Sequence, residues 1–177
     1  MLRPGRDDDA ADFIALVASC WAEYPGCVFD LDGEVPELRA LARHFRDKGG
    51  ALWVWQEADR VAGMVAAWPA DPPESWEIGK MYVDRRLRGG GVAATLLAQA
   101  EAHATARGAQ RLELWSDSRF ARAHAFYAKH GFVRSGRTRA LGDKSHTVEY
   151  HFAKAARAAP AEQDPSSVRR NRRVANV

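Results

Sequence analysis

The sequence has little of what marks a membrane, secreted or metal-binding protein. No apolar run reaches the roughly 18 residues of a membrane-spanning helix, and the N-terminus, MLRPGRDDD, lacks the apolar core of a signal peptide. Only two cysteines occur, Cys20 and Cys27, and neither has a Cys or His partner at zinc-ligand spacing. We therefore expect a cytoplasmic protein with reduced thiols, no metal and no membrane contact.

The net charge of +3 arises at the C-terminal end of the chain. Residues 154–177 hold six Lys or Arg and two Asp or Glu, whereas residues 1–153 hold 20 and 21 and are close to neutral. A near-neutral domain argues against nucleic-acid binding by the folded part. The Ala, Pro, Ser and Arg of the tail are typical of disorder. We therefore predict one domain over residues 1–153 and a basic, disordered tail over 154–177.

Hydrophobic periodicity and turn residues predict the order of the secondary-structure elements. Ser116, Asp117 and Ser118 are expected to cap a short helix that follows them. A hairpin followed by alternating strands and helices indicates an α+β (mixed α/β) fold, with a mixed, mostly antiparallel sheet and about four flanking helices. The predicted strands cover residues 2–4, 51–56, 61–68, 78–83, 111–115, 132–141 and 147–152, and the helices cover 8–22, a stretch from 36, 92–107 and 120–130.

The stretch from Ile78 to Arg107 carries the clearest chemistry. A predicted strand leads into the loop DRRLRGGG, and a helix with an apolar stripe begins at Val92. Glycines allow backbone N–H groups to approach an anion closely, and a helix N-terminus adds unpaired donors and partial positive charge. Arg85, Arg86 and Arg88 add full charges. The stretch therefore predicts a phosphate-binding loop.

The loop can be compared with two known phosphate-binding motifs, the dinucleotide fingerprint and the P-loop. Gly89-x-Gly91-x-x-Ala94 fits the dinucleotide fingerprint, and Glu113 lies 22 residues beyond Gly91. In that fingerprint, however, the first glycine follows the first strand almost at once, whereas here five charged or bulky residues intervene. No Lys-Ser or Lys-Thr follows the glycines, which argues against a P-loop. A nucleotide-dependent oxidoreductase that binds a nicotinamide cofactor therefore remains one hypothesis for the function.

Two segments of the chain resemble the signatures of one superfamily. Arg86-Leu87-Arg88-Gly89-Gly90-Gly91 matches the Q/R-x-x-G-x-G/A signature of GNAT acyl-CoA N-acyltransferases, and residues 125–132, AFYAKHGF, resemble the second signature, F-Y-x-K-x-G-F. The predicted elements follow the family order over about residues 1–153. Residues 114–120 and 123–124 are similar to a subgroup often fused to MarR-type repressors, although we expect no DNA-binding domain here. The resemblance implies a GNAT-like fold.

The resemblance also implies how acetyl-CoA binds. The pyrophosphate is expected on the N–H groups that follow Arg88, and the pantetheine arm along the backbone of the strand from Met81 to Val83. Phe120 stands where the family often has asparagine, so Ser118 is the candidate to replace its hydrogen bond. On this basis the cofactor residues are Met81, Tyr82, Val83, Arg86, Arg88, Gly89, Gly90, Gly91, Val92, Ala93, Ala94, Ser118 and Phe126.

The family mechanism assigns two catalytic roles. Tyr127 matches the tyrosine that protonates the departing thiolate, and a phenol with an ordinary pKa near 10 can do so. Glu77 lies where many relatives keep a glutamate that acts as a base through water, and His146 is a second candidate base. A core tyrosine and a solvent-facing glutamate are the structural alternatives for Tyr127 and Glu77.

The family's acceptor pocket lies between two loops, here residues 24–34 and 141–146. Their carboxylates favour a cationic amine, and the loop spacing does not fit an EF-hand. A polyamine, an amino acid, an aminoglycoside and a protein amine all remain open as acceptors. The alternative to an acetyltransferase is a non-catalytic acyl-CoA sensor or interaction module. A homodimer remains open as the assembly. The residues assigned to the acceptor are Tyr24, Asp30, Asp32, Glu34 and His146.

Overall fold

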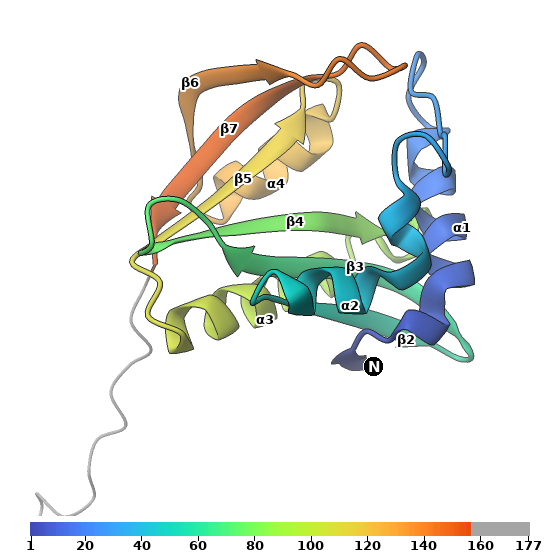
Figure 1. The fold of residues 1–177 in the computed structure, drawn as a ribbon, viewed down its shortest axis with the longest axis horizontal. Helices are drawn as coiled ribbons and strands as arrows, with labels where there is room; N and C mark the ends of the chain where they lie inside the picture. Colours follow the sequence, from blue (N-terminus) through green and yellow to red (C-terminus); the bar gives the residue numbers. More distant parts are fainter. Residues whose placement is uncertain (157–177) are drawn as a thin grey trace, which may run out of the picture.

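A seven-stranded sheet forms the centre of the protein in a computed structural model that describes residues 1–156 (Figure 1). The strand order is β1-β2-β3-β4-β5-β7-β6. Every neighbouring pair is antiparallel except β4 and β5, which confirms the predicted mixed, mostly antiparallel sheet. The strands are β1 (Leu2–Pro4), β2 (Ala51–Glu57), β3 (Arg60–Pro69), β4 (Ser75–Val83), β5 (Arg111–Asp117), β6 (Val133–Ala140) and β7 (Val148–Ala155).

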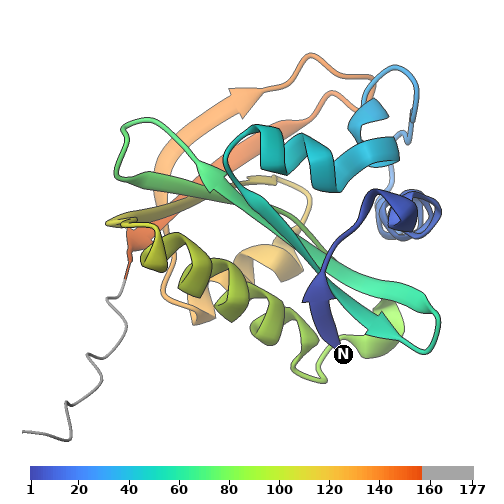
Figure 2. The same cartoon turned by 60° about the horizontal axis from the view of Figure 1, so that its bottom comes forward.

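Helices cover both faces of the sheet (Figure 2). α1 (Ala10–Trp21) and α2 (Leu41–Asp47) pack on one face, where Phe13, Leu38 and Phe45 are completely or almost completely buried. α3 (Val92–Ala106) and α4 (Ala121–Lys129) pack on the other. Short 3₁₀ turns precede α1 and α2 at Asp7–Asp9 and Pro36–Ala40, and a third, Arg85–Leu87, follows β4. The four helices match the prediction.

The sheet opens between β4 and β5. These strands pair in parallel only where Ser75–Glu77 face Arg111–Glu113. Beyond that point β5 stays paired with β7 as far as Asp117 and Glu149, so β5, β7 and β6 leave β4 as a unit (Figure 1). The opening gives the sheet a V shape that can receive a ligand between its two halves.

Local details differ from the sequence predictions in three places. β4 begins at Ser75, three residues earlier than expected. Ser116 and Asp117 end β5, where they pair with β7, and the residue at the N-cap of α4 is Phe120, with no side-chain cap. The Asp117 carboxylate accepts hydrogen bonds from the N–H and guanidinium of Arg119. β7 continues to Ala155, past the predicted domain end, while most of the predicted tail lies outside the described residues. Within 1–156, no helix is long and apolar enough to cross a membrane.

Candidate active site

A cavity of about 1080 Å³ occupies the opening of the sheet. Its walls come from β4, β5, α4, the segment after α1, α2 with the turn before it, and the loop between β6 and β7. Glu77 of β4 and Tyr127 of α4 both line it, as the family resemblance predicts. No group of three or more His, Cys, Asp or Glu within residues 1–156 could hold a metal ion.

A bulge in β4 shapes the floor of the cavity. Met64 of β3 pairs with Tyr82, whereas Ala66 pairs with Gly79, so β4 holds an extra residue between them. Lys80 adopts a left-handed φ of 51°, which is strained for a residue with a side chain. On the far side of the bulge, Met81, Tyr82 and Val83 have β3 on one edge, and no described strand pairs with the other. An extended ligand can therefore add there as a strand.

The glycine loop leaves backbone donors free at the start of α3. Gly89 and Gly91 have φ angles of 82° and 86°, and a Cβ on either would meet nothing within 4 Å. The first backbone bond into α3 runs from Thr95 N–H to Gly91 O. Within residues 1–156, no backbone acceptor takes the N–H groups of Gly91, Val92, Ala93 and Ala94. Free backbone donors and the dipole at a helix N-terminus favour the binding of an anion, so this loop remains the candidate phosphate site.

The two arginines assigned to the pyrophosphate are engaged within the protein. The guanidinium of Arg86 pairs with Asp84 at 2.8 Å. Arg88 donates to Glu23 beyond the end of α1 at 2.5 and 2.7 Å, and to the carbonyl of Val83 at 3.0 Å. Arg88 therefore ties the loop to α1, and the backbone N–H groups at the start of α3 stay open to an anion.

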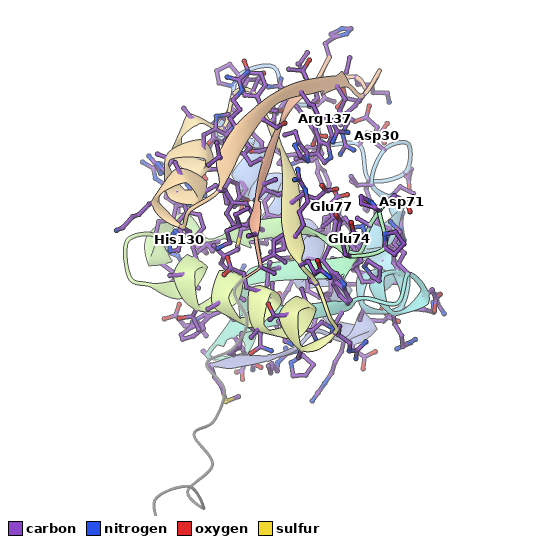
Figure 3. The ribbon with its side chains drawn as sticks, turned by 90° about the vertical axis from the view of Figure 1, so that its left-hand side faces the viewer. Asp30, Asp71, Glu74, Glu77, His130 and Arg137 are labelled. Carbon is purple, nitrogen blue, oxygen red and sulfur yellow. The ribbon has the colours of Figure 1, made fainter. Side chains whose placement is uncertain are left out.

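Glu77 has the electrostatic properties of a base. Its side chain is half-buried, and Glu77 lies between β3 and β5, in register with Trp68 and Glu113 (Figure 3). Burial raises the pKa of Glu77 to about 7, and the nearby carboxylates of Glu113 and Glu149 act in the same direction. A carboxylate that changes protonation state near neutral pH can accept a proton from an amine.

Tyr127 has the properties of an acid. Its ring is buried at an edge-to-face angle to Phe126 and Phe132, with centroids 5.6 and 5.9 Å away. Burial raises the pKa of Tyr127 above that of a free phenol, so the hydroxyl stays protonated at neutral pH. Tyr82 also lines the cavity, but its oxygen accepts a hydrogen bond from Trp21 Nε1 at 3.0 Å.

The residues that the sequence assigns to the amine substrate fall into two groups. Asp30 and Glu34 line the cavity, where Asp30 pairs with Lys144 Nζ and Glu34 accepts the Lys144 N–H at 2.5 Å. Asp32 pairs with Arg39 at 2.5 Å on the surface, and His146 is exposed.

The structure does not bring Asp32 and His146 to the cavity wall. Tyr24 is not part of the wall either, and its ring packs at a tilt against Phe120 with the centroids 4.5 Å apart. Ser118 and Phe126 are also outside the wall.

Several residues that line the cavity could not be identified from the sequence patterns. The indole of Trp68 lies across β4, where a Cβ on Gly79 would come within 2.6 Å of it. Lys80 pairs with Glu37 at 2.7 Å across the same wall. Trp115 faces the cavity under Arg139, whose guanidinium lies 4.3 Å from the indole centroid. A glycine inside a strand, as at Gly79, was the one available sign of such close packing.

The fold defines the class of protein. It matches an N-acetyltransferase from Staphylococcus aureus Mu50 with a TM-score of 0.72 and 20% identity, over 89% of this chain and 98% of that one. A ribosomal-protein-alanine N-acetyltransferase from Brucella melitensis matches with a TM-score of 0.68 and 21% identity, over 88% and 99%. An aminoglycoside 6'-N-acetyltransferase complexed with coenzyme A matches with 0.67 and 15%, over 90% and 99%. These likenesses identify a GNAT fold.

The sequence then identifies the family. The profile of the Acetyltransferase (GNAT) family matches residues 13–132, which is more than half of the chain. The chain therefore belongs to this family, and membership indicates acyltransferase activity. No curated protein sequence matches the chain.

The glycine loop allows a matched test of the anion site. In both Gly91→Ala and Gly108→Ala, a left-handed residue gains a Cβ that meets nothing within 4 Å, one at each end of α3. Each variant should lose about 1–2 kcal/mol of stability from backbone strain. Only Gly91→Ala should also weaken acetyl-CoA binding, because it disturbs the free N–H groups. Equal acetyl-CoA affinities of the two variants by calorimetry would argue against the site.

Proposed function

We propose that this protein is an N-acetyltransferase that transfers an acetyl group from acetyl-CoA to a primary amine by direct attack in a ternary complex. The observation that supports it best is the joint position of Glu77 and Tyr127. One carboxyl with a pKa of about 7 and one buried phenol line the same cavity, beside the open edge of β4. A base for the incoming amine and an acid for the leaving thiolate are the two groups that acetyl transfer requires.

The chain's own groups provide each part of this reaction. The N–H groups at the start of α3 hold the pyrophosphate, and the open edge of β4 orients the pantetheine arm. A backbone N–H at Met81 or Val83 donates to the thioester oxygen, a contribution of about 3–4 kcal/mol when the donor is preorganised. Glu77 takes a proton from the amine, the N–C bond forms, the C–S bond breaks, and Tyr127 gives its proton to the sulfur.

The fold relatives give this proposal its acceptor class. Two of them, by their names, acetylate an aminoglycoside and an alanine of a ribosomal protein, and both acceptors are amines. The nicotinamide hypothesis loses its acidic residue, because Glu113 is 8% exposed and its Oε2 lies 3.4 Å from His151. A buried carboxylate with a protein partner is not available to a ribose.

Calorimetry followed by a thiol-release assay tests the proposed function. We expect acetyl-CoA to bind with a Kd between about 1 μM and 1 mM, the usual range for enzyme substrates. A panel of polyamines, amino acids, aminoglycosides and peptides should then include at least one amine that releases free CoA. Binding without release by any amine would favour the acyl-CoA sensor. Absence of binding at millimolar acetyl-CoA, or tighter binding of NAD, would contradict both.

A further inference from the structure

A row of polar side chains crosses the cavity side of the sheet, one from each of four neighbouring strands. Glu77 of β4 is the register partner of Glu113 of β5. Next to Glu113 lies His151 of β7, and beyond it Ser135 of β6, the outermost strand. The row therefore leads from the candidate base to the outer edge of the sheet.

The middle of this row is buried and hydrogen-bonded. His151 is 0% exposed and Glu113 is 8% exposed. His151 Nε2 lies 3.4 Å from Glu113 Oε2, and Nδ1 lies 2.8 Å from Ser135 Oγ. Ser135 belongs to β6, whose residues are all exposed. Both ring nitrogens of a buried imidazole are therefore engaged, one toward the cavity side and one toward solvent.

Such a pair is hard to explain by packing alone. Burying a titratable pair usually stabilises a fold no better than apolar residues of the same size. On the opposite face of the same strand, Phe152 fills the core with an ordinary apolar side chain. The pair Glu113–His151 thus has a composition that suits proton transfer more than it suits stability.

We propose that Glu113, His151 and Ser135 form a proton relay that carries the amine's proton from Glu77 to solvent at β6. This inference rests on the proposed function, because Glu77 is the group that supplies the proton.

Each transfer in the relay is balanced. The proton passes from the Glu77 carboxyl to the Glu113 carboxylate, and from there to one ring nitrogen of His151. A neutral imidazole holds one proton and one free nitrogen, so His151 accepts on one side and releases on the other. The released proton goes to Ser135 Oγ, whose own proton goes to water. No bond other than those to hydrogen changes.

The position of Glu77 explains why a relay is useful. With acetyl-CoA and an acceptor in the cavity, the water around this half-buried carboxyl is displaced. Without a relay, its proton therefore stays on Glu77 until the products leave and solvent returns. The relay exits at β6, outside the cavity wall.

Charged side chains surround both Glu77, where the relay begins, and His151 in its middle. Glu77 faces Glu113 of β5, Arg139 of β6, Glu149 of β7 and Lys48 after α2. The ring of His151 faces Glu113 and Arg111 of β5 and Arg137 of β6, and it lies at a tilt to the Trp115 indole, with the ring centroids 4.7 Å apart. Burial and the two arginines lower the pKa of His151, whereas Glu113 opposes them. A transiently charged imidazole therefore releases its proton readily.

Substitution of His151 by glutamine tests the relay, because glutamine can keep hydrogen bonds but cannot carry a proton. We expect His151→Gln to lower kcat about tenfold in dilute buffer, because Glu77 then loses its proton only after the products leave. Added imidazole or concentrated buffer should restore most of the loss by taking the proton from Glu77 in the emptied cavity. The KM for acetyl-CoA should not change. His103→Gln is the matched control: His103 is half-buried against Trp53 and Trp76 on the opposite face, and its kcat should not depend on buffer.

The outcomes separate the relay from the proposed function. If the wild-type chain releases no thiol with any amine, both are overturned. If wild type is active and His151→Gln keeps its full, buffer-independent kcat, the relay alone is overturned. A loss that buffer does not restore, together with a lower Tm, would assign His151 a structural role and also overturn the relay.

Discussion

Tyr127→Phe should lower kcat roughly a hundredfold, at the lower end of the range for loss of a general acid. The change removes only the hydroxyl, so the packing of the ring against Phe126 and Phe132 is kept. The loss should be modest for an acid because a thiol with a pKa near 8.5 can leave without full protonation. For the same reason, the deficit should shrink between pH 7 and 9. Steady-state kinetics over this range, with the Kd for acetyl-CoA, measure both effects.

Two tyrosines serve as controls for this assignment. Tyr150→Phe removes a hydroxyl outside the cavity wall, and its kcat should equal that of wild type. Tyr82→Phe leaves Trp21 Nε1 without its acceptor, so it should lower stability more than turnover. If Tyr82→Phe lowers kcat more than Tyr127→Phe, or if Tyr127→Phe mainly weakens acetyl-CoA binding, the acid is not Tyr127.

The order of elements and the glycine loop could be predicted because each depends on local patterns. The apolar stripe of α3 and the αL glycines at positions 89 and 91 are properties of short stretches of chain. The same holds for the helix that carries Tyr127. Family signatures combine such local features, so they identify the family and a candidate cofactor loop without any knowledge of the tertiary structure.

The acceptor side could not be predicted in the same way, because it depends on contacts between distant segments. Charge alone suggested Asp32, yet its partner Arg39 lies on the same surface and keeps it out of the cavity. The strained backbone of Lys80 results from a register shift against β3, which no pattern in β4 specifies. Likewise, only the folded chain brings Glu113 to His151, 38 residues away.

Arg88 illustrates a limit of signature matching. The signature correctly locates the loop, but it does not specify what the guanidinium binds. Glu23 is 65 residues away in sequence and meets Arg88 only because α1 ends beside the loop. The signature arginine therefore holds the loop in place, and the glycines next to it leave the backbone open to the anion.

Glu77→Gln should lower activity and raise stability together. In the wild type, kcat/KM should rise about tenfold per pH unit below pH 7 and level off above it, because only ionised Glu77 accepts the amine's proton. Glutamine cannot accept a proton, so the variant should lose about two orders of magnitude at pH 8, and its pH profile should lack the inflection near 7. Rate measurements from pH 5.5 to 9 with one fixed amine, buffers overlapping, would show both.

The burial of Glu77 also determines how Glu77→Gln changes the unfolding free energy. The pKa of Glu77 is about 7 in the folded chain against 4.5 for the free side chain, so the folded state holds this proton more tightly. The stability that the protonated form contributes is complete below pH 4.5 and is lost as pH rises through 7. At 1.36 kcal/mol per pKa unit, the loss is at most about 3 kcal/mol. Glutamine does not ionise, so the unfolding free energy of Glu77→Gln should exceed that of wild type by a margin that grows between pH 4.5 and 7.

Glu57→Gln is the matched control, because it makes the same chemical change at an exposed position at the end of β2. It should change neither the rate profile nor the pH dependence of unfolding. If Glu77→Gln retains an inflection near pH 7, another group acts as the base. If the activity is lost without the gain in stability at pH 8, other groups stabilise the ionised Glu77 and offset the cost of its burial. Burial would then not explain a raised pKa of Glu77 or its ability to take a proton from the amine.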